Sequence, residues 1–272
     1  KPVWYPVTLD FEGPLCSEYQ DNPNPFLDFR MDVCFTAPDG SMVTAPGFFA
    51  GDGRGGGFGN VWRCRFNPDQ PGIWRYAVSF RYGVEAAVSL DRHVGVPSTF
   101  NGATGRFSVL PRNLTAPGLL RDGRLEYVGE HYLKARDGDY FIKTGTNSPE
   151  NFFAYKGFDD VQDNGNIGII HEYAPHVADW RLGDPYFVSN SGGDSRGIIG
   201  ALNYLGSEGV NSIYFLPMNL GGDGQDTCPF IAYTRTRYTK THYDVSRMHQ
   251  WNIVLNHAQE QGILVHFVLA ET

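Results

Sequence analysis

Helical patterns and apolar, strand-length runs alternate in the last third of this sequence, and this alternation constrains the fold more than any other feature. Residues 197–209 form a helical pattern, and residues 210–217 follow as a short apolar run. A second helical pattern at 246–261 is followed by a second apolar run at 263–270. Strands this apolar, separated by helices, are typical of a parallel sheet that is covered on both faces.

The second helical pattern carries clear signals at both of its ends. Asp244 or Ser246 can cap its first turn, and Gly262 can supply the left-handed residue that ends it. The predicted buried stripe consists of Met248, Trp251, Leu255 and Ala258. Two strands and two helices cannot close a parallel sheet. We therefore expect the 272 residues to be the front part of a longer enzyme, with most of the catalytic machinery beyond them.

Residues 1–110 have a different rhythm, which is typical of antiparallel β-structure. Turn signals such as Pro38-Asp-Gly40 and Asn101-Gly102 separate short strand-like runs. In one run Trp74, Tyr76, Val78 and Phe80 alternate with polar residues. The predicted strands cover residues 3–11, 26–36, 61–66, 74–82 and 105–110. This spacing predicts a β-sandwich.

Residues 111–194 are expected to bridge this sandwich and a third region, residues 195–272. Asp137-Gly-Asp139 predicts a hairpin turn between strands at 127–133 and 140–143. Residues 157–195 are rich in Gly, Asp and Asn and have no clean period. We expect this stretch to be an ordered loop. The predicted chain is therefore multidomain.

Charge and cysteine spacing exclude several classes of function. The net charge of −8 argues against nucleic acid as a partner, because nucleic-acid binding depends on neutralising phosphates. No apolar stretch is long enough to predict a membrane span. Four cysteines without a Cys-x-x-Cys pair predict no structural metal. Cys34 and Cys64 lie in predicted strands and are either bridged or simply buried. No cofactor is expected, and the oligomeric state is left open.

The N-terminal region resembles a bacterial β-sandwich domain of unknown function that precedes glycoside hydrolase barrels. The ordered motifs that carry this resemblance are Asn24-Pro-Phe26, Pro46-Gly-Phe-Phe-Ala-Gly51, Arg65-Phe-Asn-Pro68 and Gly72-Ile-Trp74. The stretch from Tyr243 to Trp251 and its flanking strands are similar to the opening of the attached clan A type TIM barrels. The resemblance implies a β-sandwich followed by the start of a (β/α)8 barrel. It also implies a secreted or periplasmic bacterial glycoside hydrolase.

In that family the catalytic carboxylates lie at the ends of the fourth and seventh barrel strands, which these residues do not reach. No catalytic residue is therefore assigned. Two substrate-binding candidates follow from the position of functional groups at the carboxyl ends of barrel strands. Asn219 follows the first apolar run and Glu271 ends the second. Asn219 could bind a sugar hydroxyl or cap the loop backbone. Glu271 could accept a hydrogen bond from a sugar hydroxyl, orient a catalytic carboxylate, or form a salt bridge at the end of the strand.

Four further candidates come from loops. His242 and Tyr243 lie where the long loop returns to the second helical pattern, and either could line a sugar subsite. Tyr243 could equally be a packing residue. Asn151 and Trp180, in the bridge, are suited to binding sugars by hydrogen bonding and stacking.

The leading hypothesis is a two-carboxylate glycoside hydrolase that acts on a plant or algal polysaccharide. One alternative is a non-catalytic carbohydrate-binding module, which would expose an aromatic strip; Trp4, Trp62, Trp74 and Tyr82 are the candidate rings. Another is a polysaccharide lyase with a Tyr or His base. Fold resemblance alone does not decide among them.

Overall fold

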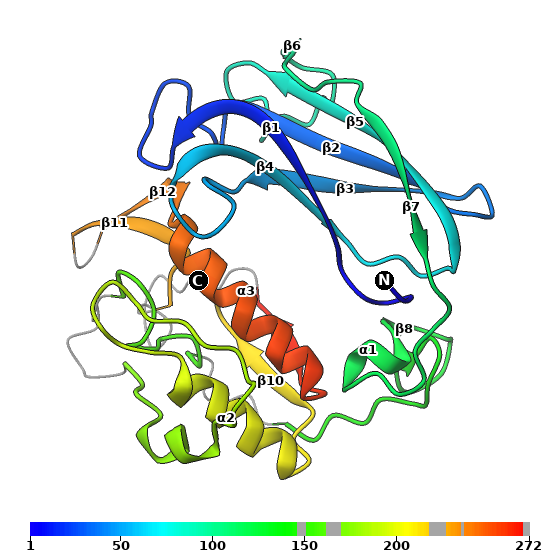
Figure 1. The fold of residues 1–272 in the computed structure, drawn as a ribbon, viewed down its shortest axis with the longest axis vertical. Coiled ribbons are helices and arrows are strands. Elements are labelled where there is room, and N and C mark those ends of the chain that lie inside the picture. Colours follow the sequence, from blue (N-terminus) through cyan, green and yellow to red (C-terminus); the bar gives the residue numbers. More distant parts are fainter. Residues whose placement is uncertain (146–150, 162–169, 218–226, 235–236, 269–272) are drawn as a thin grey trace. The chain divides into compact units, whose positions relative to one another are not determined.

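The computed structural model describes residues 1–145, 151–161, 170–217, 227–234 and 237–268 (Figure 1). The chain divides into two compact units. Unit 1 contains Lys1–Leu114 and Lys240–Ser246, and unit 2 contains Thr115–Thr239 and Arg247–Thr272. Among the described residues, no helix combines the length and apolarity needed to cross a membrane.

Unit 1 is built on one curled, antiparallel sheet of seven strands (Figure 1). The strand order is β1-β4-β3-β2-β5-β6, and β7 pairs with β5. The strands are β1 (Val7–Ser17), β2 (Phe29–Thr36), β3 (Met42–Phe49), β4 (Phe58–Phe66), β5 (Gly72–Tyr82), β6 (Val96–Pro97) and β7 (Thr104–Val109). The five predicted strands are present with shifted bounds, and the sheet has the predicted sandwich-like character.

Strand β3 was not predicted, because its residues are mostly exposed and Pro46-Gly47 reads as a turn. In the structure this dipeptide marks the point where β3 changes partner. Asp32 of β2 pairs with Pro46, whereas Gly47 pairs with Cys64 of β4. A Cβ atom on Gly47 would overlap the side chain of Met31. Glycine is therefore required where the strand passes over the core.

Aromatic side chains fill the core of unit 1. Trp62, Trp74, Phe35 and Phe80 are almost fully buried, and Phe80 stacks on Phe100 with ring centroids 4.1 Å apart. The aromatic excess of the sequence is thus used largely for packing in this unit. All four cysteines are free thiols, and Cys16 and Cys64 are buried. Burial raises the pKa of each of these two thiols to about 11.

Unit 2 contains the predicted alternation of helices and parallel strands. Its central elements are α2 (Arg196–Ser207), β10 (Ser212–Phe215), α3 (Val245–Glu260) and β13 (Leu264–Phe267). Strands β10 and β13 pair in parallel, with Ser212 opposite Leu264. Between β10 and α3 lie β11 (Phe230–Thr234) and β12 (Arg237–Tyr243), which pair with each other. The predicted order of helix, strand, helix and strand is confirmed.

Gly262 confirms the predicted end of α3, a cap by Asp244 or Ser246 stays a prediction, and the buried face of the helix differs from the prediction. The Ser246 hydroxyl donates to the Asp244 carboxylate, and Gly262 has a positive φ of 77°. A carboxylate oxygen of Glu18 also accepts the Val245 N–H at 2.7 Å. The buried positions of the helix are Val245, Arg247, Gln250, Trp251, Val254, His257 and Ala258. Met248 is exposed, so its predicted place in the stripe is wrong.

The bridging region forms only short elements. They are α1 (Leu119–Asp122), β8 (Leu125–Glu126), β9 (Lys134–Ala135) and the 3₁₀ helix η1 (Ala174–Asp179). The predicted turn at Asp137–Asp139 is present, since Lys134 bridges Tyr140 and the Ala135 N–H donates to the Asp139 carbonyl. The long strands predicted on either side of it do not form. Two paired strands without a covered face are only marginally stable in water.

Substitution Gly47→Ala is expected to lower the free energy of unfolding by about 1–3 kcal/mol, because the added methyl group forces Met31 out of its place. Urea unfolding followed by tryptophan fluorescence measures this loss. Thr44→Ala, at an exposed position of the same strand, is the control and should change stability by less than about 0.5 kcal/mol. Equal losses in both variants would contradict the role of Gly47.

Candidate functional site

Two of the six candidate residues, Asn219 and Glu271, lie outside the described residues. Their roles at the ends of the strands remain predictions. The other four fall into three separate clusters. Among the described residues, no three His, Cys, Asp or Glu side chains gather in a way that could hold a metal ion.

Asn151 is buried in unit 2 and pairs with a histidine that the sequence did not single out. Its Oδ1 lies 2.9 Å from Nε2 of His171. The His171 ring stacks on Tyr173, with centroids 5.1 Å apart, and the Tyr173 hydroxyl donates to the Phe152 carbonyl. Burial lowers the pKa of His171, so the imidazole is neutral at pH 7. A neutral imidazole beside an amide can donate and accept hydrogen bonds, which are the interactions that sugar hydroxyls need.

Trp180 belongs to a second cluster, in the loop after η1. Its indole N–H donates to the Pro185 carbonyl, and Tyr186 meets the indole edge to face at 6.2 Å. The N–H group is thus used within its own loop. Trp180 is half-buried and packs against the hydrophobic core of unit 2, and its role in stacking on a sugar remains a prediction.

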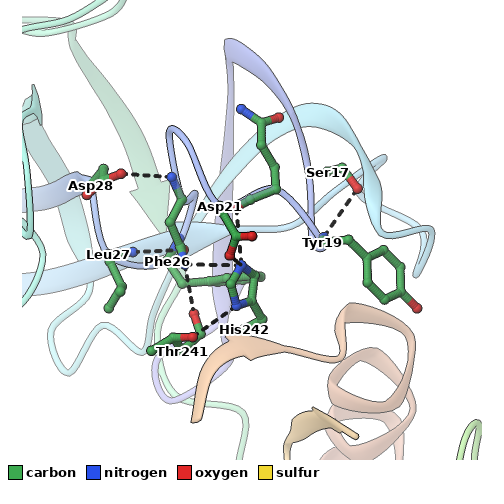
Figure 2. A network of polar contacts seen from close by, with 10 residues as sticks. Ser17, Tyr19, Asp21, Phe26, Leu27, Asp28, Thr241 and His242 are labelled. Carbon is green, nitrogen blue, oxygen red and sulfur yellow. Dashed lines mark hydrogen bonds and ion pairs between the residues drawn. The ribbon is translucent and has the colours of Figure 1, made fainter. Parts of the chain in front are cut away.

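His242 and Tyr243 lie in unit 1, where His242 is part of a polar network (Figure 2). Nδ1 of the His242 ring lies 3.0 Å from the Thr241 hydroxyl, and Nε2 lies 3.2 Å from the Gln20 carbonyl and 3.5 Å from a carboxylate oxygen of Asp21. In Figure 2 the side chains of Asp21, Thr241 and His242 point toward one another. The His242 ring is 3% exposed. This geometry supports a structural tie, and a sugar-binding role for His242 remains a prediction.

Asn24 organises this network and gives a physical meaning to the Asn24-Pro-Phe26 motif. Its Oδ1 accepts the N–H of Phe26 at 2.8 Å and that of Leu27 at 3.2 Å. Its Nδ2 donates to the Thr241 carbonyl and contacts Nε2 of His242, each at 3.2 Å. One buried amide therefore shapes its own turn and anchors residues more than 200 positions away in the sequence.

Phe26 supplies the apolar half of the same anchor. Its ring meets Tyr243 edge to face at 5.4 Å and also packs against Phe49. Burial raises the pKa of Tyr243, so its phenol is protonated at neutral pH. Tyr243 is partly exposed as well as packed, which leaves both of its predicted roles open.

A further buried histidine, His257, lies between α2 and α3. Its Nε2 lies 2.8 Å from Oδ1 of Asn203, whose amide group donates to the Asp184 carboxylate at 2.7 Å. Its Nδ1 has no hydrogen-bond partner among the described residues and lies 3.9 Å from a carboxylate oxygen of Glu260. Burial lowers the pKa of His257, and the negative charge of Asp184 opposes this shift. Burial also raises the pKa of Glu260.

Substitution Asn24→Ala should destabilise unit 1 by about 1–3 kcal/mol, because the main-chain groups that Asn24 serves lose a buried partner. Chemical denaturation monitored by circular dichroism gives the value. Asp21→Asn is the matched control, since Asp21 is highly exposed and its contact with His242 is the longest in the network. A loss in Asn24→Ala no larger than in this control would show that the anchor is unimportant.

The stability of the protein should fall as the pH is lowered through the ordinary histidine range near 6.5. A depressed pKa means that folded His257 binds fewer protons than the unfolded chain in this range, so acid favours unfolding. Substitution His257→Gln should flatten the dependence between about pH 7.5 and about pH 5.5. Thermal unfolding across this range tests the prediction. His93→Gln, at an exposed position, should keep the wild-type slope; a wild-type slope in His257→Gln would refute the assignment.

Comparisons with known proteins relate part of the chain to a domain family and the chain to a solved fold. Residues 1–81 match a domain of unknown function, DUF5060. The structure is similar to a crystal structure named "putative glycoside hydrolase" from Bacteroides vulgatus ATCC 8482, with a TM-score of 0.62 and 19% sequence identity. The match covers 98% of this chain and 40% of that protein, so the chain spans well under half of its length. No curated protein matches. At this identity the likeness establishes a shared fold.

Proposed function

We propose that the chain is the N-terminal part of a bacterial glycoside hydrolase, with a sandwich-like unit followed by the opening of a (β/α)8 barrel. The observation that carries the proposal is the parallel pair β10–β13, connected through α3. A strand, helix and parallel strand in this order form the repeating unit of such barrels. The likeness over 98% of this chain to 40% of a solved protein that is named "putative glycoside hydrolase" supports the placement of this chain in a longer protein.

A third segment, residues 142–145, lies beside the amino end of β10 and is held there by the Asn211 side chain. The Asn211 side chain accepts the Thr144 N–H and donates to the Ile142 carbonyl, both at 2.8 Å. A Cβ atom on Gly145 would overlap the Ser212 carbonyl. The Asn211 carbonyl itself accepts the Leu264 N–H on the other edge. These contacts beside β10 are compatible with the proposed barrel, in which β10 has a neighbour on each side.

The free surface of β13 supports further strands beyond it. Phe267 is 45% exposed, although parallel strands are normally covered on both faces. In the proposed barrel, additional strands and helices cover this ring. The catalytic carboxylates then lie at the carboxyl ends of strands outside the 272 residues, and Asn219 and Glu271 stay the predicted substrate-binding residues.

The substrate in this proposal is a plant or algal polysaccharide, and the protein is secreted or periplasmic. The net charge of −8 is unfavourable for nucleic acid. The alternative of a carbohydrate-binding module requires aromatic rings exposed at the surface, and most of the candidate rings are buried. Trp4, Trp62 and Trp74 are 4%, 1% and 2% exposed, and only Tyr82, at 39%, reaches the surface. We therefore assign these tryptophans to packing.

The test is product analysis of the intact protein on a panel of plant and algal polysaccharides, with reducing ends and unsaturated products read together. New reducing ends without unsaturation are expected, because two carboxylates add water across the glycosidic bond. The 272-residue chain alone should show no turnover. Unsaturated products would point to a lyase instead, and turnover by the 272 residues would place the carboxylates within them.

A further inference from the structure

The buried face of α3 is unusually polar. Arg247, Gln250 and His257 lie on it beside Trp251 and Val254, and Arg247 is 3% exposed. A buried guanidinium costs several kcal/mol unless its N–H groups are satisfied. The partners of Arg247 therefore show which part of the structure the buried guanidinium stabilises.

Within the described parts of the chain, Arg247 donates to four main-chain carbonyls in two separate segments. Nε reaches the Asp159 carbonyl at 2.9 Å and Nη2 reaches that of Asp160 at 2.8 Å. Nη1 donates to the carbonyls of Cys228 and Phe230. Because the acceptors are main-chain atoms, these bonds fix the path of the backbone. A planar fork of five donors can do this, whereas the single ammonium group of lysine cannot.

Gln250, one turn further along α3, holds the first of these segments from a second side. Its Oε1 accepts the Asp159 N–H at 2.8 Å. The Asp159 carboxylate accepts the Asn190 N–H at 2.6 Å. Asp160 has a positive φ of 52°, which is uncommon for a residue other than glycine. The turn is therefore held in a defined, locally unfavourable conformation by bonds from several directions.

The position of Arg247 in unit 2 follows from the topology. At the amino end of the parallel pair the Leu264 N–H donates to the Asn211 carbonyl, and at the carboxyl end the Val268 N–H donates to the Phe215 carbonyl. The chain leaves the carboxyl end of β10 before α3 and enters the amino end of β13 after it. The first turn of α3, with Arg247, therefore lies on the carboxyl side of the sheet. Ligands of α/β folds bind on this side.

We propose that Arg247 is a positioning residue for the carbohydrate site: it fixes two edge segments, residues 158–160 and 227–230, at the carboxyl edge of the β10–β13 pair. The inference rests on the proposed glycoside hydrolase function and deepens it. Arg247 touches no reacting atom. It acts by holding the backbone that frames the substrate.

The experiment compares wild type, Arg247→Ala and Arg247→Lys in the intact protein. The first readout is hydrogen exchange of the two edge segments, with the amides of residues 251–258 in α3 as the internal reference. Faster exchange is expected in both edge segments of both variants, with the reference unchanged. Guanidinium ion at a concentration below denaturation should restore slow exchange in Arg247→Ala, whereas sodium chloride at equal ionic strength should not.

The second readout is kinetics on the panel polysaccharide from which the wild-type protein releases reducing ends. Both variants should lose about tenfold to a hundredfold in kcat/KM, mainly through a higher KM, because misplaced binding groups weaken substrate orientation. The pH profile should keep its shape, since a positioning residue touches no reacting atom. Arg196→Gln is the matched control: it removes an arginine from the start of α2 whose ion pair with Asp194 is on the surface, and it should behave like wild type.

Three outcomes would overturn the proposal. The first is that hydrogen exchange of the two edge segments does not change. The second is that the amides of α3 lose as much protection as the edge segments do. The third is that the edge segments exchange faster while kcat/KM stays unchanged. If Arg247→Ala does not fold, Arg247→Lys decides between the same outcomes. If no panel polysaccharide is hydrolysed, the proposed function fails; altered edge exchange then shows that Arg247 orders the backbone, and the inference about a carbohydrate site falls with the function.

Discussion

Buried polar side chains that bond to distant main-chain groups are the interactions on which much of this structure depends. A buried donor or acceptor without a partner costs more than a hydrogen bond contributes, so each such group restricts where the chain can go. Asn24 holds the backbone at Thr241 within unit 1, and Arg247 holds two segments within unit 2. Glu18 adds a third case, because its carboxylate accepts the first N–H of α3. These contacts join segments far apart in sequence, and they act beside the aromatic cores.

Close approach of backbone and side chain is the second constraint. Gly47 lets β3 lie over Met31 at the point where the strand changes its partner from β2 to β4. Because β3 pairs with both strands, β1 and β4 belong to the same curled sheet as β2 and β5. Gly57 serves a related purpose, since a Cβ atom there would overlap the Glu18 carboxylate. Packing at this density tolerates no added methyl group without a shift of its neighbours. The motif Pro46-Gly-Phe-Phe-Ala-Gly51 therefore reflects geometry of the sheet.

The spacing of apolar residues was sufficient to predict the helices and strands that have one regularly buried face. The helices α2 and α3 and the parallel strands between and after them lie close to their predicted positions, as do β2, β4, β5 and β7 of unit 1, whereas β1 begins and ends later than predicted. Strand β3 was not predicted because most of its residues are exposed, which leaves no alternation of apolar and polar residues to detect. The buried stripe of α3 was predicted from apolar residues alone, which included Met248 and left out Arg247 and His257.

The candidate site could be predicted only in part. The structure pairs Asn151 with His171, which the sequence did not indicate because His171 lies in a stretch without any periodic signal. Asn219 and Glu271 lie outside the described residues.

The sequence by itself determined the classes of element, their order, and the change from antiparallel strands to helices alternating with parallel strands. These depend on patterns within about ten to fifteen residues, where apolar spacing and turn chemistry act locally. Only the tertiary structure decided which polar side chains are buried and what they hold. The partners of Asn24 and Arg247 lie far away along the chain, and no local pattern encodes a hydrogen bond whose acceptor is a distant carbonyl. The inward-facing side of α3 was decided in the same way, because burial of a charged residue depends on the backbone that surrounds it.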